Sequence, residues 1–327
     1  MPLATVVILV KNAESYIKET LEAVLAQETD IEFEVLVIDS GSKDRTLEMI
    51  QSYPVRVIHI QPEEFNHGDT RNLGARQAHP ESKFIVYLTQ DAEPYDHLWL
   101  QNLLKPFDED FSVAGVFSRH VPRPTASVST VRQLTTLSQT GGLQKLVKKM
   151  PATSEEFENN KFWYIYFSNT SSAIRRETWE QIPFDRVDFA EDAVWAEKVV
   201  LAGYTLIFEP ASIVVHSHDY NPIEQFRQNV DHSHAFYKLF HPSSYDDNRL
   251  WMKMFLGIPL QVWQDWKFLQ ISEYFSDKKE WFKISTMVNS PFWQLATVSG
   301  GWVGAHLDHM APALKRLLSR QERIKQS

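Results

Sequence analysis

The chain has 327 residues, a net charge of −9 and no cysteine, with 43% apolar and 23% charged residues. This size allows one large α/β domain plus an appendage, or two modest domains. The lack of cysteine excludes disulfides, thiolate metal sites and a cysteine nucleophile. Because no concentrated basic run occurs in the first two thirds, we expect no nucleic-acid partner. The start, Met1–Ile8, has neither a basic region nor a small-residue cleavage site, so we expect no signal peptide and a cytoplasmic location.

Apolar strands alternate with amphipathic helices over about the first hundred residues. The predicted strands are Ala4–Val10, Glu34–Asp39, Val55–Ile60 and Phe84–Asp91. Each is followed by apolar residues at helical spacing, and this alternation predicts an α/β fold with a mostly parallel, doubly wound sheet. No Gly-x-Gly-x-x-Gly or Walker loop follows the first strand. Neither a Rossmann dinucleotide site nor a P-loop is therefore expected.

The remaining chain is less regular. A strand is predicted at Val113–Arg119, and residues 122–161 have the weak, polar pattern of a long, partly helical excursion, a kind of segment that often serves as a lid. After it we expect order at Tyr164–Ile174, helices from Glu177 and after Asp188–Asp192, and short strands at Thr205–Phe208 and Ile213–His216. From Ile223 onward the pattern is helical. We expect one α/β domain over 1–222, with halves 1–120 and 121–222, and a helical region over 223–327.

Two predicted strands end in a carboxylate, Asp39 and Asp91. In open α/β sheets, ligands gather beyond the carboxyl ends of the strands. Asp91 is therefore well placed to hold a hard cation that bridges phosphate oxygens, and such a cation can neutralise a diphosphate without a basic patch. The alternative is that Asp91 only caps the next turn.

Several motifs, in this order, resemble the family 2 glycosyltransferases of the GT-A fold. They are the first apolar strand, Val37–Thr46, the strand-end Asp91 before Pro94, and Phe189–Asp192. Four further stretches resemble the bacterial rhamnosyltransferase branch of that family: Phe65–Ala75, Leu88–Pro94, Ser168–Arg176 and Val215–His218. The resemblance covers roughly Ala4 to Tyr220. It implies that residues 1–120 bind a nucleotide sugar and that residues 121–222 bind the acceptor and carry the catalytic residues.

The resemblance implies a nucleotide pocket at the ends of the first strands. Asp39 would accept a hydrogen bond from the ring N–H of uracil or thymine, although an N-cap role for the next helix is the alternative. Asp69 and Arg71 would contact the phosphates, or else form a salt-bridged helix start. The further implied nucleotide-binding residues are Val10, Lys11, Glu14 and Gln90.

The resemblance also implies a metal ion, Mn²⁺ or Mg²⁺. Asp91 would be a ligand, and Thr89 stands where the fold's Asp-x-Asp motif has its first carboxylate. His216 and His218, at alternate strand positions, point the same way, and we expect one of them, His216 first, to be a second ligand. Imidazole with carboxylate suits Mn²⁺ better than Mg²⁺.

For the chemistry, the resemblance implies that Asp192, beside Glu191, is the catalytic base of an inverting transfer. The alternative is that both carboxylates only stabilise the start of a helix. On the acceptor side the resemblance points to Asn169, Arg175 and Trp195. The implied reaction moves a sugar, rhamnose from dTDP-rhamnose first, onto a glycan or lipid-linked glycan. The alternatives are a UDP-sugar donor (N-acetylhexosamine, galactose or glucose) and a non-catalytic nucleotide-sugar-binding protein.

The C-terminal third is rich in tryptophan and ends in a basic tail, Leu314–Lys325, with an apolar patch at Leu317 and Leu318. Such a tail can lie on an anionic membrane surface, here the inner face of the cell membrane. Gly300 and Gly304 have the spacing of small residues in membrane helix dimers. Packing on the catalytic domain and a homodimer interface remain alternatives to membrane contact.

Overall fold

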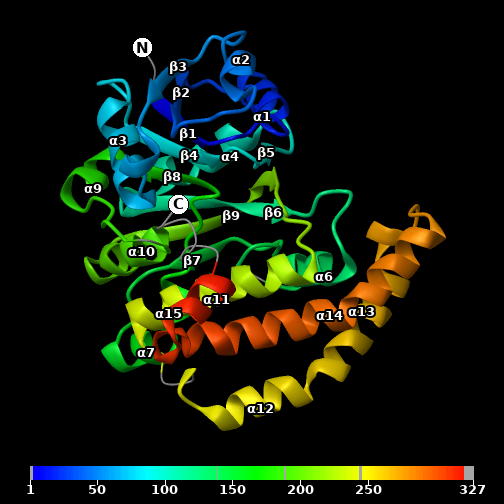
Figure 1. The fold of residues 1–327 in the computed structure, drawn as a ribbon. Coiled ribbons are helices and arrows are strands. Elements are labelled where there is room, and N and C mark those ends of the chain that lie inside the picture. The colour runs from blue at the N-terminus through cyan, green and yellow to red at the C-terminus, as the bar shows by residue number, and fades with distance from the viewer. Residues whose placement is uncertain (1–2, 138, 188, 243–244, 320–327) are drawn as a thin grey trace. The chain divides into compact units, whose positions relative to one another are not determined.

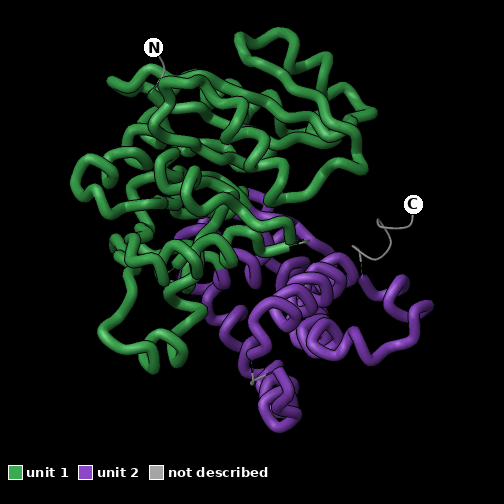
Figure 2. The backbone as a smooth tube through the Cα atoms, turned by 90° about the vertical axis from the view of Figure 1, so that its left-hand side faces the viewer, with its two compact units in different colours: residues 1–123, 134–216 green, residues 124–133, 217–327 purple. Residues whose placement is uncertain are grey.

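The computed structural model describes residues 3–137, 139–187, 189–242 and 245–319. The chain forms two compact units, one of residues 1–123 and 134–216 and the other of residues 124–133 and 217–327 (Figure 2). Each unit is described by itself.

The first unit is built on one sheet with the strand order β3-β2-β1-β4-β8-β6-β9-β5, and β7 also pairs with β9 (Figure 1). The strands are β1 Ala4–Val10, β2 Phe33–Asp39, β3 Arg56–His59, β4 Phe84–Thr89, β5 Glu93–Pro94, β6 Val113–Val121, β7 Leu146–Lys148, β8 Ser171–Arg175 and β9 Thr205–Val215. The first four strands in this order are parallel, as the alternation of strands and helices predicts.

Beyond β4 the sheet is mixed, which corrects the expectation of a mostly parallel sheet. β8 runs antiparallel to both β4 and β6, while β6 and β9 are parallel. The two short strands predicted near the end of this unit are a single strand, β9, whose register against β6 shifts between Ser118 and Arg119. Such an irregularity interrupts the apolar pattern of a strand without ending it.

Helices cover both faces of the parallel strands. α1 Ile17–Leu25, α2 Thr46–Ile50 and α4 Trp99–Leu104 pack their apolar residues on one face, against alternate residues of β1, β2 and β4. α3 His67–Gln77 lies on the other face, where Gly74 approaches the side chains of Val7 and Ile38. The remaining helices of this unit are α5 Pro106–Glu109, α7 Ser154–Asn159, α8 Lys161–Tyr164, α9 Arg176–Gln181 and α10 Glu191–Leu201.

The excursion expected over residues 122–161 contains more regular structure than its sequence pattern predicts. It holds α6 Val128–Thr136, strand β7 and helices α7 and α8. Lys148, the last residue of β7, is fully buried, and its ammonium group donates hydrogen bonds to the Gln139 side chain and the Tyr166 carbonyl. The rings of Phe117, Trp163 and Tyr166 lie around the same group. These hydrogen bonds and ring contacts fix the segment to the sheet, and burial lowers the pKa of Lys148 to about 7.

The second unit is helical, as expected for the C-terminal third. Its helices after β9 are α11 Pro222–Phe240, α12 Asn248–Leu256, α13 Ile258–Ile271, α14 Glu280–Ala305 and α15 Pro312–Leu318. The buried Asp265 on α13 accepts hydrogen bonds from Ser129 and Arg132 of α6 and from Ser290 and Gln294 of α14. A charge buried this deeply needs all of these donors, so the network holds the three helices together.

Gly300 and Gly304 act within the chain. A Cβ at either position would lie 2.4 Å from a backbone oxygen of α11, that of Phe226 or Val230. The small residues therefore allow α11 and α14 to pack closely, which accounts for their spacing without a membrane dimer. Among the described residues, no helix combines the length and hydropathy needed to cross a membrane. The basic tail expected over 314–325 lies outside the described residues from 320 onward.

We predict that Gly74→Ala destabilises the protein by roughly 1–3 kcal/mol, because the added Cβ would lie 2.5 Å from Val7 Cγ1 in a buried contact. Helix propensity alone would make the alanine variant more stable by about 1 kcal/mol, so a lower free energy of unfolding must come from the packing clash. The measurement is denaturant unfolding in the wild-type and Val7→Ala backgrounds. The cost should be smaller in the Val7→Ala background, and an equal cost in both would contradict the packing argument.

Candidate active site

Three parallel strands end at one edge of the sheet and place polar side chains there. Val10 and Asp39, the last residues of β1 and β2, are paired in register, and Thr89 ends β4 beside Leu9. The loops that follow these strands therefore meet at the carboxyl edge, where ligands of open α/β sheets bind. The expected nucleotide residues Val10, Lys11, Glu14, Asp39 and Gln90 are all brought to this edge.

Hydrogen bonds within the protein hold these loops in place. Asp39 is buried and accepts from the backbone N–H groups of Gly41 and Ser42. The N-cap role considered as its alternative is wrong, because Arg45 is the N-cap of the next helix, α2. The Gln90 side chain accepts from the Lys11 N–H at 2.7 Å and donates to the Lys11 carbonyl at 3.3 Å. Glu14 accepts from the Arg45 N–H. The rim of this edge is thus ordered by its own polar side chains.

Asp69 and Arg71, at the start of α3, both form salt bridges within the protein. This arrangement is the one considered above as the alternative to phosphate contact. Asn66 caps the helix by accepting from the N–H groups of Gly68 and Asp69. Arg71 turns inward and pairs with Glu191 at 2.9 Å, with both side chains only 7% exposed. Asp69 pairs with Arg186. In this structure the Arg71 charge is taken up by a buried carboxylate, and contact between Arg71 and phosphate stays a prediction.

The adjacent carboxylates Glu191 and Asp192 begin α10 and have opposite electrostatic environments. Burial, together with the neighbouring Glu191 charge, raises the pKa of Asp192 to about 7. The pKa of Glu191 is lowered by the charges of Arg71 and His67, against the effect of its burial. Neighbouring titratable groups whose pKa values are pushed apart are a mark of acid–base sites.

Asn169 joins these carboxylates to the strand-end edge. Its backbone N–H donates to Asp192 at 3.2 Å and its side-chain amide donates to Glu191 at 3.1 Å. The next residue, Thr170, accepts from the N–H of Thr89 at 3.0 Å. Because β8 runs antiparallel to β4, its first residues lie where β4 ends. The carboxylate pair is therefore linked through two consecutive residues to the end of β4.

Two residues expected on the acceptor side are structural. Arg175 lies opposite Phe84, at the other end of β4, and its guanidinium donates to the carbonyls of Val113 and Phe107. Trp195 is fully buried and donates to the Ile182 carbonyl, so it has no face to offer a sugar. Both positions follow from register and helical phase, which the motif resemblance does not specify.

The expected metal ligands lie together at the same edge. Asp91 Oδ2 is 3.6 Å from His216 Nε2, and Asp91, His216 and His218 form a group whose potential ligand atoms lie within 4.8 Å of one another. The buried Thr89 Oγ1, two residues before Asp91, has no hydrogen-bond partner among the described residues. A carboxylate, imidazoles and an unsatisfied hydroxyl fit a divalent cation, with the nitrogen ligands favouring Mn²⁺.

Sequence reasoning missed two features of this site. Arg123 donates to the Asp91 carbonyl and lies over the Tyr16 ring at 4.8 Å, contacts between distant parts of the chain that no local pattern specifies. Ala190, immediately before Glu191, has a φ of 58°. A left-handed alanine has no sequence signal, and such strain is characteristic of functional sites.

Comparison with solved structures defines the class of protein. The mannosyltransferase PcManGT from Pyrobaculum calidifontis, in complex with GDP-Man and Mn²⁺, is 17% identical, with a TM-score of 0.58 over 94% of this chain and 86% of that one. S. aureus TarS 1–349 is 15% identical, with a TM-score of 0.50 over 94% of this chain and 92% of that one. The fold is the GT-A fold of glycosyltransferases, with a helical C-terminal region.

Sequence comparison defines the family. The profile of Glycosyl transferase family 2 matches residues 5–181, and the chain belongs to this family. It is 31% identical over 207 residues to the O-antigen chain rhamnosyltransferase WbaN of Salmonella anatum, a match that spans 63% of each chain, somewhat under two thirds. It is 30% identical over 230 residues to RfbN of Salmonella typhimurium, over 69% of this chain and 70% of that one. Within the family, its sequence is rhamnosyltransferase-like.

We predict that Asp192→Asn stabilises the protein increasingly as the pH rises from about 4 to about 7. An aspartate has an ordinary pKa of about 3.9 in the unfolded chain, whereas Asp192 in the folded protein has a pKa of about 7. Between these values the unfolded state binds fewer protons, so wild-type stability falls as the pH rises, while the neutral amide is unaffected. The measurement is unfolding at pH 4.5, 6 and 7.5, with the exposed Glu158→Gln as control. A stability difference that does not change with pH would contradict the raised pKa.

Proposed function

We propose that the chain is an inverting, metal-dependent glycosyltransferase that moves rhamnose from dTDP-rhamnose onto a glycan or lipid-linked glycan. The observation that carries the proposal is the carboxylate pair, in which Glu191 is held charged by Arg71 while burial raises the pKa of Asp192. A base with a pKa near the working pH is suited to removing a hydroxyl proton during attack. The similarity to two O-antigen rhamnosyltransferases supports the choice of sugar.

In this mechanism Asp192 accepts the proton of the acceptor hydroxyl as that oxygen attacks the anomeric carbon of the donor. The new glycosidic C–O bond forms as the bond from the anomeric carbon to the diphosphate breaks, and the nucleoside diphosphate leaves with the electron pair. Asn169 positions the base, because its backbone N–H donates to Asp192 Oδ2. Glu191, ion-paired with Arg71, stays charged and positions Asn169 through the side-chain hydrogen bond.

The donor nucleotide is proposed to bind at the edge formed by β1, β2 and β4. Asp39 has both oxygens oriented by the N–H groups of Gly41 and Ser42, and each carboxylate oxygen can accept more than one hydrogen bond. It would accept the ring N–H that thymine and uracil share. Val10, Lys11, Glu14 and Gln90 would line this pocket, and Asp69 would lie at its border.

Asp91 and His216, with His218 as a third candidate, would hold Mn²⁺ or Mg²⁺ at this edge. The bound cation would neutralise the charge that develops on the leaving diphosphate. The Mn²⁺ in the PcManGT complex supports this assignment. The unsatisfied Thr89 hydroxyl would contribute through hydrogen bonding at the position where the fold's motif has a carboxylate.

Two alternatives keep the fold and change the function. A UDP-sugar donor leaves the site intact, since uracil presents the same ring N–H. A non-catalytic nucleotide-sugar-binding protein would use the edge without Asp192. The Asp192→Asn variant distinguishes the enzyme from the non-catalytic protein. In the enzyme, this substitution should abolish sugar transfer while dTDP binding, measured by calorimetry, remains.

We predict that dTDP-rhamnose alone is turned over in a panel of nucleotide sugars with Mn²⁺ or Mg²⁺, and that turnover is lost in EDTA and in Asp91→Ala. The exposed Asp108→Ala, on α5, is the matched control. Chromatographic detection of released dTDP or UDP is the measurement. Turnover of a UDP-sugar instead would discard the rhamnosyl assignment, and a fully active enzyme in EDTA would discard the metal.

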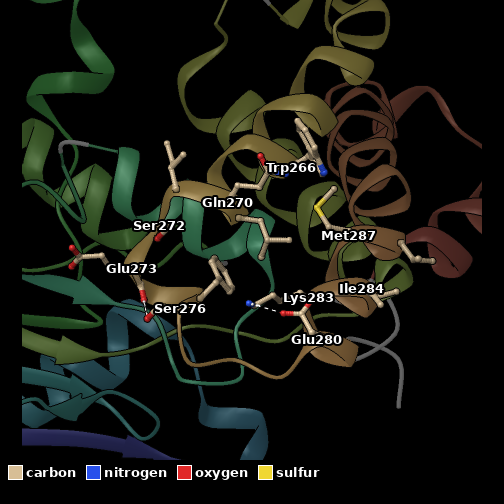
Figure 3. Close-up of a pocket in the computed structure, with 13 residues that line it drawn as sticks. Trp266, Gln270, Ser272, Glu273, Ser276, Glu280, Lys283, Ile284 and Met287 are labelled. Atoms are coloured by element: carbon tan, nitrogen blue, oxygen red, sulfur yellow. Dashed lines mark hydrogen bonds and ion pairs between the residues drawn. The ribbon is translucent and has the colours of Figure 1, made fainter.

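We further propose that the second unit contacts an anionic lipid surface through exposed apolar side chains of α13 and α14. An apolar groove of about 680 Å³ runs between these helices, lined by Trp266, Ile284 and Met287, with Lys283 paired to Glu280 beside it (Figure 3). The large side chains exposed along the two helices recur at helical spacing: Leu260, Trp263, Trp266, Ile271, Trp281, Ile284, Val288, Phe292 and Leu295.

The net charge of these helices favours an anionic lipid surface over a second copy of the chain as the partner of this apolar face. Residues 248–305 carry six Lys or Arg and four Asp or Glu, a net charge of +2 in a chain of −9. Tryptophan and lysine on one amphipathic surface match the chemistry of an anionic bilayer interface. The homodimer is the competing occupant.

We predict that Ile271→Ser/Ile284→Ser lowers co-sedimentation with phosphatidylglycerol vesicles several-fold, because these side chains are 75% and 62% exposed and would enter the interface. The control is Phe111→Ser, which is 86% exposed in the first unit. Sedimentation velocity runs alongside. Unchanged vesicle binding, or a wild-type dimer that the double variant dissociates, would overturn the lipid proposal.

A further inference from the structure

A second cavity lies within the helical unit and differs in chemistry from the apolar groove. Its volume is about 290 Å³, near the lower end of small-molecule sites, which run from roughly 300 to 1,000 Å³. Three segments line it: the start of α6, the turn into α11 and one side of α14. The lining side chains that could bind a ligand are hydroxyl, amide and aromatic groups and one carboxylate: Thr125, Ser127, Asp219, Tyr220, Asn289 and Trp293.

The wall formed by α14 and α6 is fixed by internal hydrogen bonds. The hydroxyls of Ser129 and Ser290 donate hydrogen bonds to the buried Asp265 carboxylate. The Thr286 hydroxyl accepts a hydrogen bond from the Val128 N–H at 2.7 Å. Thr125 donates to Asp219 across the opening. These bonds hold the cavity in one shape before any ligand arrives, which lowers the entropic cost of binding.

Other polar groups of the cavity remain available. Ser285 and Asn289 lie one turn apart on α14, both are exposed, and neither side chain has a hydrogen-bond partner among the described residues. An amide and a hydroxyl at this spacing can both donate and accept. Phe282 and Trp293 continue the same side of the helix and supply apolar ring surface.

The charge of the lining selects the class of ligand. Among the described residues that line the cavity there is no Lys or Arg, and the one side chain charged at neutral pH is Asp219. A phosphate, a diphosphate or a carboxylate ligand would meet that negative charge without compensation. A neutral molecule with many hydroxyls and apolar C–H faces fits both the amide and hydroxyl groups and the rings.

We propose that this cavity binds a neutral saccharide unit of the acceptor glycan. The proposal rests on the proposed transferase function. The position of the cavity in the chain also supports the proposal. Asp219 directly follows the candidate metal ligand His218, and the Tyr220 ring stacks on the His218 imidazole with ring centroids 4.8 Å apart. It gives Ser285, Asn289 and Asp219 a role in choosing the acceptor, whereas the donor is chosen at the strand-end edge.

The test uses saturation-transfer NMR on the full chain with methyl α-L-rhamnoside, methyl α-D-mannoside, methyl α-D-galactoside and methyl β-N-acetylglucosaminide as probes. At least one probe should bind the wild type, and Ser285→Ala/Asn289→Ala should weaken that binding at least tenfold. Ser299→Ala, half-buried on α14 and outside the cavity, is the control. Both substitutions lie on a helix surface and favour helix, so thermal unfolding should stay close to wild type.

Transfer kinetics and dTDP calorimetry separate this proposal from the transferase proposal. The double variant should raise the acceptor KM at least tenfold with dTDP affinity unchanged. No probe binding, or an unchanged acceptor KM in an active enzyme, overturns the cavity proposal and leaves the transferase standing. Probe binding that the double variant abolishes, in a protein that turns over no donor and does not bind dTDP, upholds saccharide binding and removes the transferase function.

Discussion

The ion pair between Arg71 and Glu191 is the interaction on which the candidate site depends. It joins α3 to α10, and both side chains are almost completely removed from water. Breaking a buried pair by removing one partner costs about 3–5 kcal/mol in other proteins, because a charge is left uncompensated. Here the pair also has an electrostatic effect. It keeps Glu191 charged, and that charge adds to burial in raising the pKa of Asp192.

The topology of the sheet brings this pair to the edge where the donor is proposed to bind. β4 runs toward the carboxyl edge and β8 begins there, because the two strands are antiparallel. Asn169, just before β8, therefore reaches Asp192 and Glu191 while Thr170 is bonded to the end of β4. With a parallel β8, the same residues would lie at the opposite edge. The change from a parallel to a mixed sheet is thus a condition for assembling the site.

The sequence predicts the parallel half of the sheet well, since β1, β2 and β4 are apolar runs that end at Val10, Asp39 and Thr89. It predicts the gathering of Lys11, Asp39 and Gln90 for the same reason. It does not predict where Arg175 and Trp195 lie, because one residue of register or a quarter turn of helix moves a side chain to another face. The inward turn of Arg71 depends on Glu191, a residue 120 positions away, and no local pattern encodes that contact.

Most of the buried polar atoms without hydrogen-bond partners lie where the proposed ligands would bind. Among the described residues there are six such atoms; Arg176 Nε and His234 Nδ1 lie elsewhere, and the other four are Arg71 Nε, Thr89 Oγ1, Arg119 Nε and His120 Nε2. The last three belong to the ends of β4 and β6, and the His120 ring contacts His216 edge-on at 5.5 Å. An unsatisfied buried group costs about 1–3 kcal/mol, so such atoms are normally rare and scattered. The concentration of four of these atoms at one edge, beside the left-handed Ala190 and the half-buried Asp192, indicates that this edge is built for groups that arrive with a ligand rather than for the stability of the protein alone.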